Sequence, residues 1–483
     1  MEWFNVFMKR FGIALLVTLT LASSVGVAVA SPKAGGFCTK LNSLTHIQGK
    51  TYVCSSLGKK KIWKAQSASP ASSSTNSSNG QTPSTSPTAS STVPDPALTS
   101  KTLMSDVSAC KLNSTLKGGN LGVTRDPQDI PTLGARRGVV IFVDFNDVKG
   151  DPSLFDEWKL NQIPVMEKTY ATMSYGKLTY TIDLIPQIFH ISKDSWSYLL
   201  NTPHDEPANP KASPYTLVFD AMTAADSTVD FSKYEYVNVV TPTTPNILYE
   251  GATGVSGTFD GKEITRATFS TEREYINQKQ KANWLVHETG HLMGLIHNYD
   301  VADSNGAFKA EDFQLPAWDA MTYPLTVAPD FFGWTKYILG WITDDQVDCL
   351  SAPPTSNTYH FLSPIGVSSS KTKIVVLKLD ANNLLVVESR RNSTLDRISA
   401  TQEGVIVYQV NMQTPSGQGA VKLLFNKPNV GTFPSDVLKF GPAATFRAAF
   451  GNLSPGEVLK TQGIAITYVK RSTDGDFISV SRS

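Results

Sequence analysis

Residues 287–297 read HETGHLMGLIH and hold three of the seven histidines in this 483-residue chain. On a helix, His287 and His291 stand four residues apart, so both imidazoles project from one face. Gly294 can adopt the left-handed conformation that ends a helix, which lets the chain turn back and bring His297 to the same place. The segment therefore predicts a helix, a glycine turn and a cluster of three imidazoles.

Three imidazoles in this arrangement are typical of a zinc site. Catalytic zinc takes three protein ligands and leaves a fourth position to water, and Glu288 beside the first ligand can act as a general base on that water. An ordinary helix with exposed charge is one alternative, because a bare H-E-x-x-H also arises by chance. A structural zinc site is another. The glycine and third histidine at fixed offsets favour zinc, and the lack of a fourth histidine or cysteine nearby favours catalysis.

A methionine follows the histidines, in the sequence WDAMTYP at 318–324. A methionine in a tight turn after H-E-x-x-H-x-x-G-x-x-H completes the metzincin signature. Met321 is expected beneath the metal as an apolar floor, and an ordinary core methionine is the alternative. Tyr323 is a candidate to hold the oxyanion of a tetrahedral intermediate through its hydroxyl. The alternative is a tyrosine that packs in the turn.

A polar loop at 298–306, NYDVADSNG, separates the two motifs. Its acidic and amide oxygens with a glycine make it a candidate Ca²⁺ site, and a plain polar loop is the alternative, since the spacing matches no standard calcium loop. Asp300 is also a candidate partner that orients a ligand histidine. The expected cofactors are therefore Zn²⁺ and, on the first interpretation of this loop, Ca²⁺.

The first 30 residues predict an export signal. Lys9 and Arg10 precede an apolar stretch at 12–29 that ends in the cleavage pattern Ala28-Val29-Ala30, so the mature chain is expected to start at Ser31. A transmembrane anchor is the alternative. Because no later segment approaches a membrane span, we expect a secreted protein with no stable membrane insertion after signal removal.

Export makes disulfides plausible for the four cysteines. Cys38 and Cys54 are close in sequence, so Cys38–Cys54 with Cys110–Cys349 is the simplest of three connectivities. The second bond would tie the start of the catalytic region to its end. The alternative is a free Cys110 thiolate that blocks the zinc in a latent form, which leaves Cys349 without a partner.

Composition divides the rest of the N-terminal region into a small module at 31–65 and a linker at 66–100. The module is too short for much of a core, so it needs a disulfide. Its basic run at 59–61 is expected to be a solvated face, and contact of residues 34–65 with an anionic cell envelope is the alternative. The linker is rich in Ser, Thr and Pro and is expected to be disordered.

Residues 101–349 are expected to form the zinc metallopeptidase domain. Apolar runs and helical spacing predict strands at 138–145, 178–185, 234–240 and 264–270, and helices at 153–173, 214–227 and 275–293. Pro164 is expected to break or restart the first helix. The strand at 264–270 is a hypothesis for an edge that holds an extended peptide by main-chain hydrogen bonds.

Residues 350–483 change to short β-type runs separated by turn residues, which is typical of an antiparallel sandwich. The runs lie at 374–379, 384–388, 404–410, 465–469 and 477–480. This region holds one histidine, His360, and no obvious catalytic cluster. Its expected role is structural support or substrate binding.

Over residues 110–483 the chain resembles the immune-inhibitor-A-like secreted metallopeptidases of bacteria, the M6 family. The resemblance rests on residues 138–145, 173–177, 287–297, 318–321 and 336–342. It implies an α/β (α+β) metzincin-like zinc peptidase domain followed by an antiparallel β-sandwich, and a Gram-positive source. It also implies endopeptidase activity on protein or peptide substrates, with Glu288 as the catalytic acid/base and three ligands, His287, His291 and His297.

The sequence thus predicts a secreted zinc-dependent endopeptidase in which Glu288 assists attack by zinc-bound water. One alternative is a non-catalytic zinc-bearing binding or adhesion protein at the cell surface. Another is a cell-wall-associated structural protein whose function lies in its first module and its sandwich. The complete triad with Glu288 favours the enzyme. Nucleic acid is not expected as a partner, because 43 basic residues balance 42 acidic ones.

Overall fold

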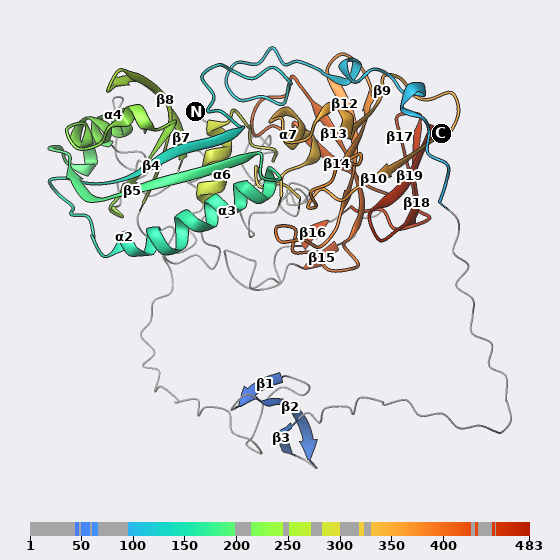
Figure 1. Ribbon diagram of the computed structural model, residues 1–483, viewed down its shortest axis with the longest axis horizontal. Helices are drawn as coiled ribbons and strands as arrows, with labels where there is room; N and C mark the ends of the chain where they lie inside the picture. The colour runs from blue at the N-terminus through green and yellow to red at the C-terminus, as the bar shows by residue number, and fades with distance from the viewer. Residues whose placement is uncertain are drawn as a thin grey trace, which may run out of the picture. The chain divides into compact units, whose positions relative to one another are not determined.

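The computed structural model describes residues 44–47, 50–57, 60–65, 95–198, 214–244, 251–271, 283–299, 318–322, 330–426, 430–432, 447–449 and 451–483. Contacts divide these residues into two compact units, one that holds 44–65 and one that holds 95–483 (Figure 1). The predicted signal at 1–30 and most of the predicted linker lie outside the described residues. None of the helices in the described part of the chain is long and apolar enough to cross a membrane.

The smaller unit contains a three-stranded antiparallel sheet. Its strands are β1 (Leu44–Ile47), β2 (Lys50–Leu57) and β3 (Lys60–Ala65), in that order. Cys54 lies on β2 opposite Trp63, is buried, and is disulfide-bonded. Cys38, its predicted partner, lies outside the described residues. A disulfide therefore does secure this sheet, whose strands are too short to bury a core of their own.

A five-stranded mixed sheet forms the first part of the larger unit. Its strands are β4 (Gly134–Asp144), β5 (Leu178–His190), β6 (Tyr236–Thr241), β7 (Gly251–Phe259) and β8 (Lys262–Thr271), in the spatial order β5-β4-β6-β8-β7. All neighbours are parallel except β7 and β8. The continuous apolar run in β4 is buried on both faces, as expected for a central parallel strand.

The strand predicted at 264–270 is found, but the hypothesis that it forms an edge is wrong. The segment lies within β8, an interior strand, and the edge beside it belongs to β7, a strand that was not predicted from the sequence. The physical reason is the composition of β7. Its glycines, at 251, 254 and 257, and a register shift between the last two hide the alternation that marks a strand.

Helices cover both faces of this sheet. They are α2 (Leu154–Glu157), a π-helical turn (Trp158–Gln162), α3 (Ile163–Met173), α4 (Pro214–Ala225) and α6 (Asn283–Leu292). Alternate residues of β4 separate the layers, because Val139 and Ile141 share a core with α4 while Val140 and Phe142 share one with α3 and α6. Pro164 lies in the first turn of α3, so the predicted restart of the helix is confirmed.

Two further sheets occupy the C-terminal part. The five-stranded sheet contains β9 (Val347–Leu350), β11 (Ile374–Lys378), β12 (Asn383–Arg390), β13 (Gly404–Asn411) and β14 (Val421–Leu424), in the order β14-β13-β12-β11-β9. The four-stranded sheet contains β10 (Thr358–Leu362), β17 (Val458–Thr461), β18 (Ile464–Arg471) and β19 (Asp476–Arg482), in the order β10-β19-β18-β17. Short strands β15 (Val430–Thr432) and β16 (Arg447–Ala449) form a separate pair.

The five-stranded C-terminal sheet is buried on both faces. Val375, Val387 and Val407 share an apolar core with the four-stranded sheet. Residues of the opposite parity, such as Val376 and Val386, belong to the core that also holds α3, α6 and α7 (Gly333–Ile338). This sheet therefore joins the helical layer to the C-terminal sheet, and the predicted boundary at 349/350 falls inside β9.

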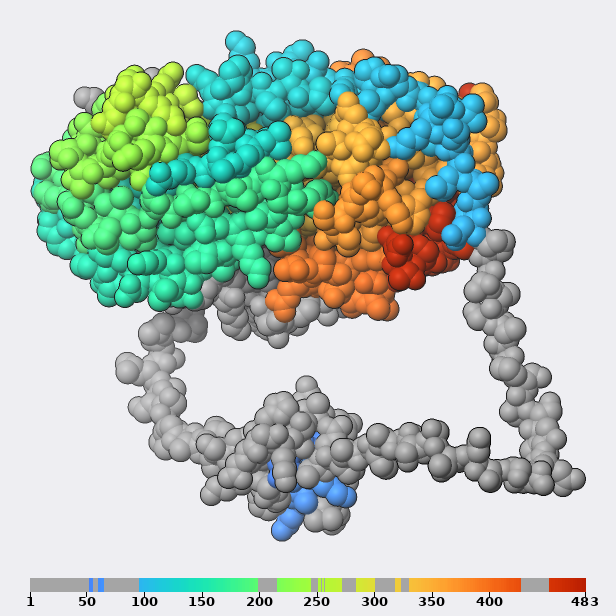
Figure 2. Space-filling model, viewed as in Figure 1, coloured from blue at the N-terminus to red at the C-terminus, as the bar shows by residue number. Residues whose placement is uncertain are grey.

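An N-terminal segment is bonded to both C-terminal sheets. Thr99 donates its backbone N–H to Tyr359 of β10 at 3.0 Å, and the disulfide Cys110–Cys349 joins this segment to β9 with a Cα–Cα distance of 6.0 Å. The predicted pairing of Cys110 is confirmed, and the alternative of a free Cys110 thiolate is wrong. Figure 2 shows the segment, in blue to cyan, on the surface beside the orange and red C-terminal residues.

Replacing both Cys110 and Cys349 by serine is expected to lower the free energy of unfolding of the larger unit by about 3–5 kcal/mol, because the bond restricts an unfolded loop with a sequence separation of 239. Urea unfolding followed by tryptophan fluorescence measures the change. Cys54→Ser is the control, since Cys54 belongs to the other unit. An unchanged midpoint in the double variant would contradict the expectation.

Candidate metal centre

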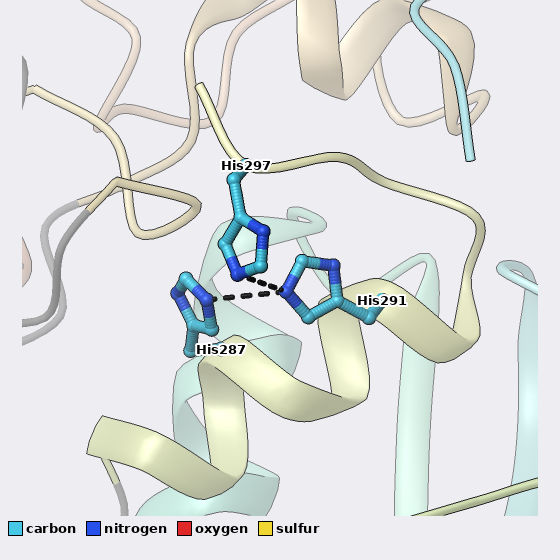
Figure 3. Close-up of side chains that lie close together, drawn as sticks. All are labelled: His287, His291 and His297. Atoms are coloured by element: carbon cyan, nitrogen blue, oxygen red, sulfur yellow. Dashed lines mark hydrogen bonds between the residues drawn. The ribbon is translucent and has the colours of Figure 1, made fainter. Parts of the chain in front are cut away.

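Three imidazoles converge on one point (Figure 3). His287 and His291 project from adjacent turns of α6, and His297 reaches them from the chain that follows the helix. The Nε2 atom of His291 lies 3.2 Å from Nε2 of His287 and 2.9 Å from Nε2 of His297. The structure therefore brings the three predicted ligands together through the same nitrogen of each ring.

The other nitrogen of each ring has its own oxygen partner. Nδ1 of His287 lies 2.7 Å from the Ala320 carbonyl, and Nδ1 of His291 lies 2.8 Å from the Leu295 carbonyl. A carbonyl only accepts, so these Nδ1 atoms carry the protons and their Nε2 atoms present lone pairs. Such lone pairs repel at this distance unless a cation lies between them, so the cluster could hold a metal ion.

The spacing and charge state also fit a metal. Tetrahedral zinc with bonds of about 2.0–2.1 Å holds its nitrogen ligands about 3.3 Å apart. Burial lowers the pKa of His291 to about 4, and burial together with the neighbouring imidazoles holds the pKa of His297 well below its usual range. Both rings are therefore neutral near pH 7, as metal ligands must be.

The end of α6 is a glycine turn. Gly294 has φ +77°, donates its N–H to the His291 carbonyl at 2.9 Å, and is followed by Leu295, whose N–H donates to the Gly290 carbonyl at 3.1 Å. This pair of bonds is the Schellman arrangement. It places the Leu295 carbonyl under His291 and turns the chain towards His297. The glycine exit predicted from the sequence is confirmed.

A segment from the N-terminal side closes the same helix end. The backbone N–H of Ile130 donates to the Leu292 carbonyl at 2.9 Å, and that of Asn120 donates to the Gly294 carbonyl at 3.1 Å. Arg125 donates from Nη2 to the Met293 carbonyl at 2.7 Å. These donors satisfy carbonyls that a helix leaves unpaired, and the guanidinium is favourable at the negative end of the helix dipole. None of these three residues was predicted from the sequence to support the site.

Met321 lies against α6 at Gly290. It is fully buried, and a Cβ atom added to Gly290 would stand 2.3 Å from its Sδ atom. The N–H of Asn298 donates to the Met321 carbonyl at 2.9 Å, so the turn also contacts the residue after His297. Packing therefore explains the glycine at position 290, because only a residue without a side chain lets the methionine approach this close.

Buried charges hold the methionine turn. Asp319 accepts from the N–H of Met321 at 2.7 Å through Oδ1 and from the N–H of Phe332 at 2.6 Å through Oδ2. Burial raises the pKa of Asp319 to about 7. Arg390, on β12 of the C-terminal sheet, donates to the Trp318 carbonyl at the start of the turn. The turn is thus attached to the C-terminal sheet as well as to α6.

The other predicted site residues divide into two groups. Glu288 lies on α6 between the first two ligands and is 4% exposed. Tyr323, Asp300 and the rest of the proposed calcium loop through 306 lie outside the described residues. Their predicted roles therefore stay predictions. His360, away from this cluster, bonds Asp348 through Nδ1 at 2.8 Å inside the C-terminal part.

Gly290→Ala is expected to lower the free energy of unfolding by about 1–3 kcal/mol, because the added methyl group overpacks against Met321. Thermal unfolding and zinc content measure the effect. Gly254→Ala in β7 is a matched control, since its Cβ would meet no atom closer than 3.9 Å. A second change, Met321→Ala, should relieve part of the loss. Equal stability of Gly290→Ala and wild type would contradict the packing argument.

The metal-free protein is expected to lose stability towards unfolding as the pH falls from about 6.5 to about 4. In that window His291 takes up a proton when unfolded but stays neutral when folded, because its folded pKa is lowered to about 4. The free energy of unfolding therefore rises with pH. Urea unfolding at about pH 7 and about pH 5 measures the slope. His291→Gln should show a shallower slope, and an identical slope would contradict the assignment.

Comparison with known proteins identifies no family for this chain. No protein-family model matches the chain, and no curated protein matches it. The geometry of its own residues is therefore the basis for assigning a function. That geometry gives a cluster of three imidazoles that could hold a metal ion, with a buried glutamate next to His287 in the sequence.

Proposed function

We propose that this chain is a secreted zinc-dependent endopeptidase that cleaves protein or peptide substrates. The observation that carries the proposal is the convergence of three Nε2 atoms, two of them with Nδ1 on a backbone carbonyl. When bound by such ligands, zinc acts as a Lewis acid that lowers the pKa of a water molecule and polarises a carbonyl. His287, His291 and His297 would hold the ion.

Glu288 is the proposed general base and acid. It follows His287 directly on α6, so its carboxylate belongs to the same short helix as two ligands. Burial is the main cause that raises the pKa of the neighbouring Tyr170, and the charge of Glu288 adds to it. A buried carboxylate next to the reacting water can take its proton during attack and return that proton to the leaving amine.

The edge of the mixed sheet supports a peptide substrate. Strand β7 lies beside α6 and pairs with β8 on one side only among the described residues. The outer strand of a sheet can bind an extended peptide through main-chain hydrogen bonds. We assign β7 this role in place of the segment 264–270. A peptide aligned with β7 would then run past the helix that carries the ligands.

We also propose a metzincin-like catalytic domain followed by a β-sandwich. A mixed sheet with α6 on one face supports a metzincin-like catalytic domain, and the apolar core between the two C-terminal sheets supports a β-sandwich. The M6 resemblance and export rest on the sequence. The alternative is a zinc-bearing binding protein at the cell surface that does not cleave. Glu288 in its buried position favours the enzyme, because simple zinc binding does not need it.

Glu288→Gln is expected to keep zinc and to reduce cleavage of casein by about 10²–10⁴-fold, because it removes proton transfer but leaves the imidazoles. Zinc content and casein hydrolysis of the purified mature chain measure the two effects. The matched control is Glu263→Gln, an exposed glutamate on β8. If the variant with glutamine at 288 cleaves as fast as wild type, Glu288 is not the base. If zinc-loaded wild type does not cleave, the binding protein is the better assignment.

A further inference from the structure

The third ligand is held differently from the other two. His287 and His291 lie on α6, and the carbonyl partner of His291 is four residues away. His297 lies beyond the helix, and its ring partner is the hydroxyl of Ser416, 119 residues further along the chain. Its position therefore depends on a part of the chain that the helix does not control.

Ser416 lies in the loop 412–420, which connects β13 to β14 of the C-terminal sheet. This loop runs beside residues 297–299. Gly417 donates its N–H to the His297 carbonyl at 3.1 Å, and Gly419 donates to the Tyr299 carbonyl at 3.1 Å. On the other side, Asn298 donates to the Met321 carbonyl at 2.9 Å. The backbone of His297 is thus bonded to the loop, and that of the next residue to the methionine turn.

The hydroxyl of Ser416 meets His297 at two atoms. Its Oγ accepts from the backbone N–H of His297 at 3.0 Å and lies 3.2 Å from Nδ1 of the same residue. A hydroxyl oxygen has two lone pairs, so it can accept from both nitrogens while its own proton points elsewhere. A proton on Nδ1 then leaves the lone pair of Nε2 directed at His291. The bond is compatible with this tautomer and restricts the rotation of the ring.

The loop itself is braced. Thr115 donates from Oγ1 to Oε1 of Gln413 at 2.7 Å, and Met412 donates its N–H to the Asn382 carbonyl at 2.8 Å. Gly417 and Gly419 have φ of +74° and +73°, conformations that other residues rarely adopt and that here direct their N–H groups at residues 297–299. The loop is therefore a defined support and can place a hydroxyl accurately.

We propose that Ser416 is a positioning residue for the metal centre, which makes the C-terminal sheet part of the site. The proposal rests on the proposed zinc site. Ser416 acts through His297, which it contacts at the backbone N–H and at Nδ1. Partners that orient a ligand histidine typically change metal affinity by about 10–100-fold when they are removed. The role expected from the sequence for the C-terminal region, support or substrate binding, becomes specific at this residue.

Ser416→Ala in the full mature chain is expected to weaken zinc binding by about 10–100-fold, measured by competition with a chromophoric chelator. Ser416→Thr keeps the hydroxyl and should restore most of the affinity. The control is Ser454→Ala, an exposed serine next to Leu453, which bridges to Val405 at the opposite end of β13. The visible spectrum of bound Co²⁺ gives a second measurement, since a misdirected third imidazole changes its bands.

The possible results distinguish the role of Ser416 from the endopeptidase proposal. Equal zinc affinity and an equal Co²⁺ spectrum in Ser416→Ala and wild type would overturn the role of Ser416. A loss that Ser416→Thr does not reverse, or that Ser454→Ala reproduces, would overturn it as well. If wild type binds zinc but does not cleave casein, the endopeptidase proposal fails while the affinity test of Ser416 still stands. If wild type binds no zinc, both proposals fail.

Discussion

A buried guanidinium connects the two parts of the larger unit. Arg390 is fully buried on β12, and it bonds Glu388 at 2.7 Å, Asp396 at 2.7 Å and the Trp318 carbonyl that starts the methionine turn. Burial alone would lower the pKa of Arg390, but the charges of Asp396 and Glu388 raise it above its usual value. Replacing such a network by apolar residues can be neutral for stability, whereas removing one partner leaves a buried charge at a cost of about 3–5 kcal/mol. The network therefore contributes mainly by fixing the position of the methionine turn relative to the C-terminal sheet.

The histidine cluster is held by four chain segments. The described part of α6 has ten residues and carries two of the three imidazoles. Residues 120–130 bond the carbonyls at its end, the methionine turn packs at Gly290, and the loop 412–420 holds the third ligand. Each support comes from a distant part of the sequence, and each meets a different atom. A ligand cluster with repelling lone pairs needs this much restraint, because the metal-free rings have no attraction of their own.

The sequence predicted those features whose cause is local. The four-residue spacing of His287 and His291 and the left-handed glycine at 294 depend on helix geometry alone, and both are found. The buried apolar run in β4 was also predicted from the sequence. Strand β7 was missed because its glycines conceal a strand pattern. Ser416, Asp319 and Arg390 were missed because no spacing rule connects residues that meet only after the sheets have packed. The histidine motif thus indicates the ligands but not what orients them.

The same contacts bear on where the N-terminal region can be processed. Arg125, Asn120 and Ile130 bond the end of α6, and Cys110 is covalently attached to β9. Thr99 bonds Tyr359 of β10 through its backbone N–H and its hydroxyl oxygen, although it belongs to the stretch that composition assigns to the linker. Its backbone pairing explains the difference, because a polar residue at a strand edge gains order from the sheet and needs no apolar side chain. A cut before residue 95 would leave all these bonds intact. A cut between 110 and 120 would leave residues 120–130 on the fragment that carries α6, and the disulfide Cys110–Cys349 would still join the two fragments. The end of α6 therefore depends on residues 120–130, and a cut on their N-terminal side breaks none of its bonds.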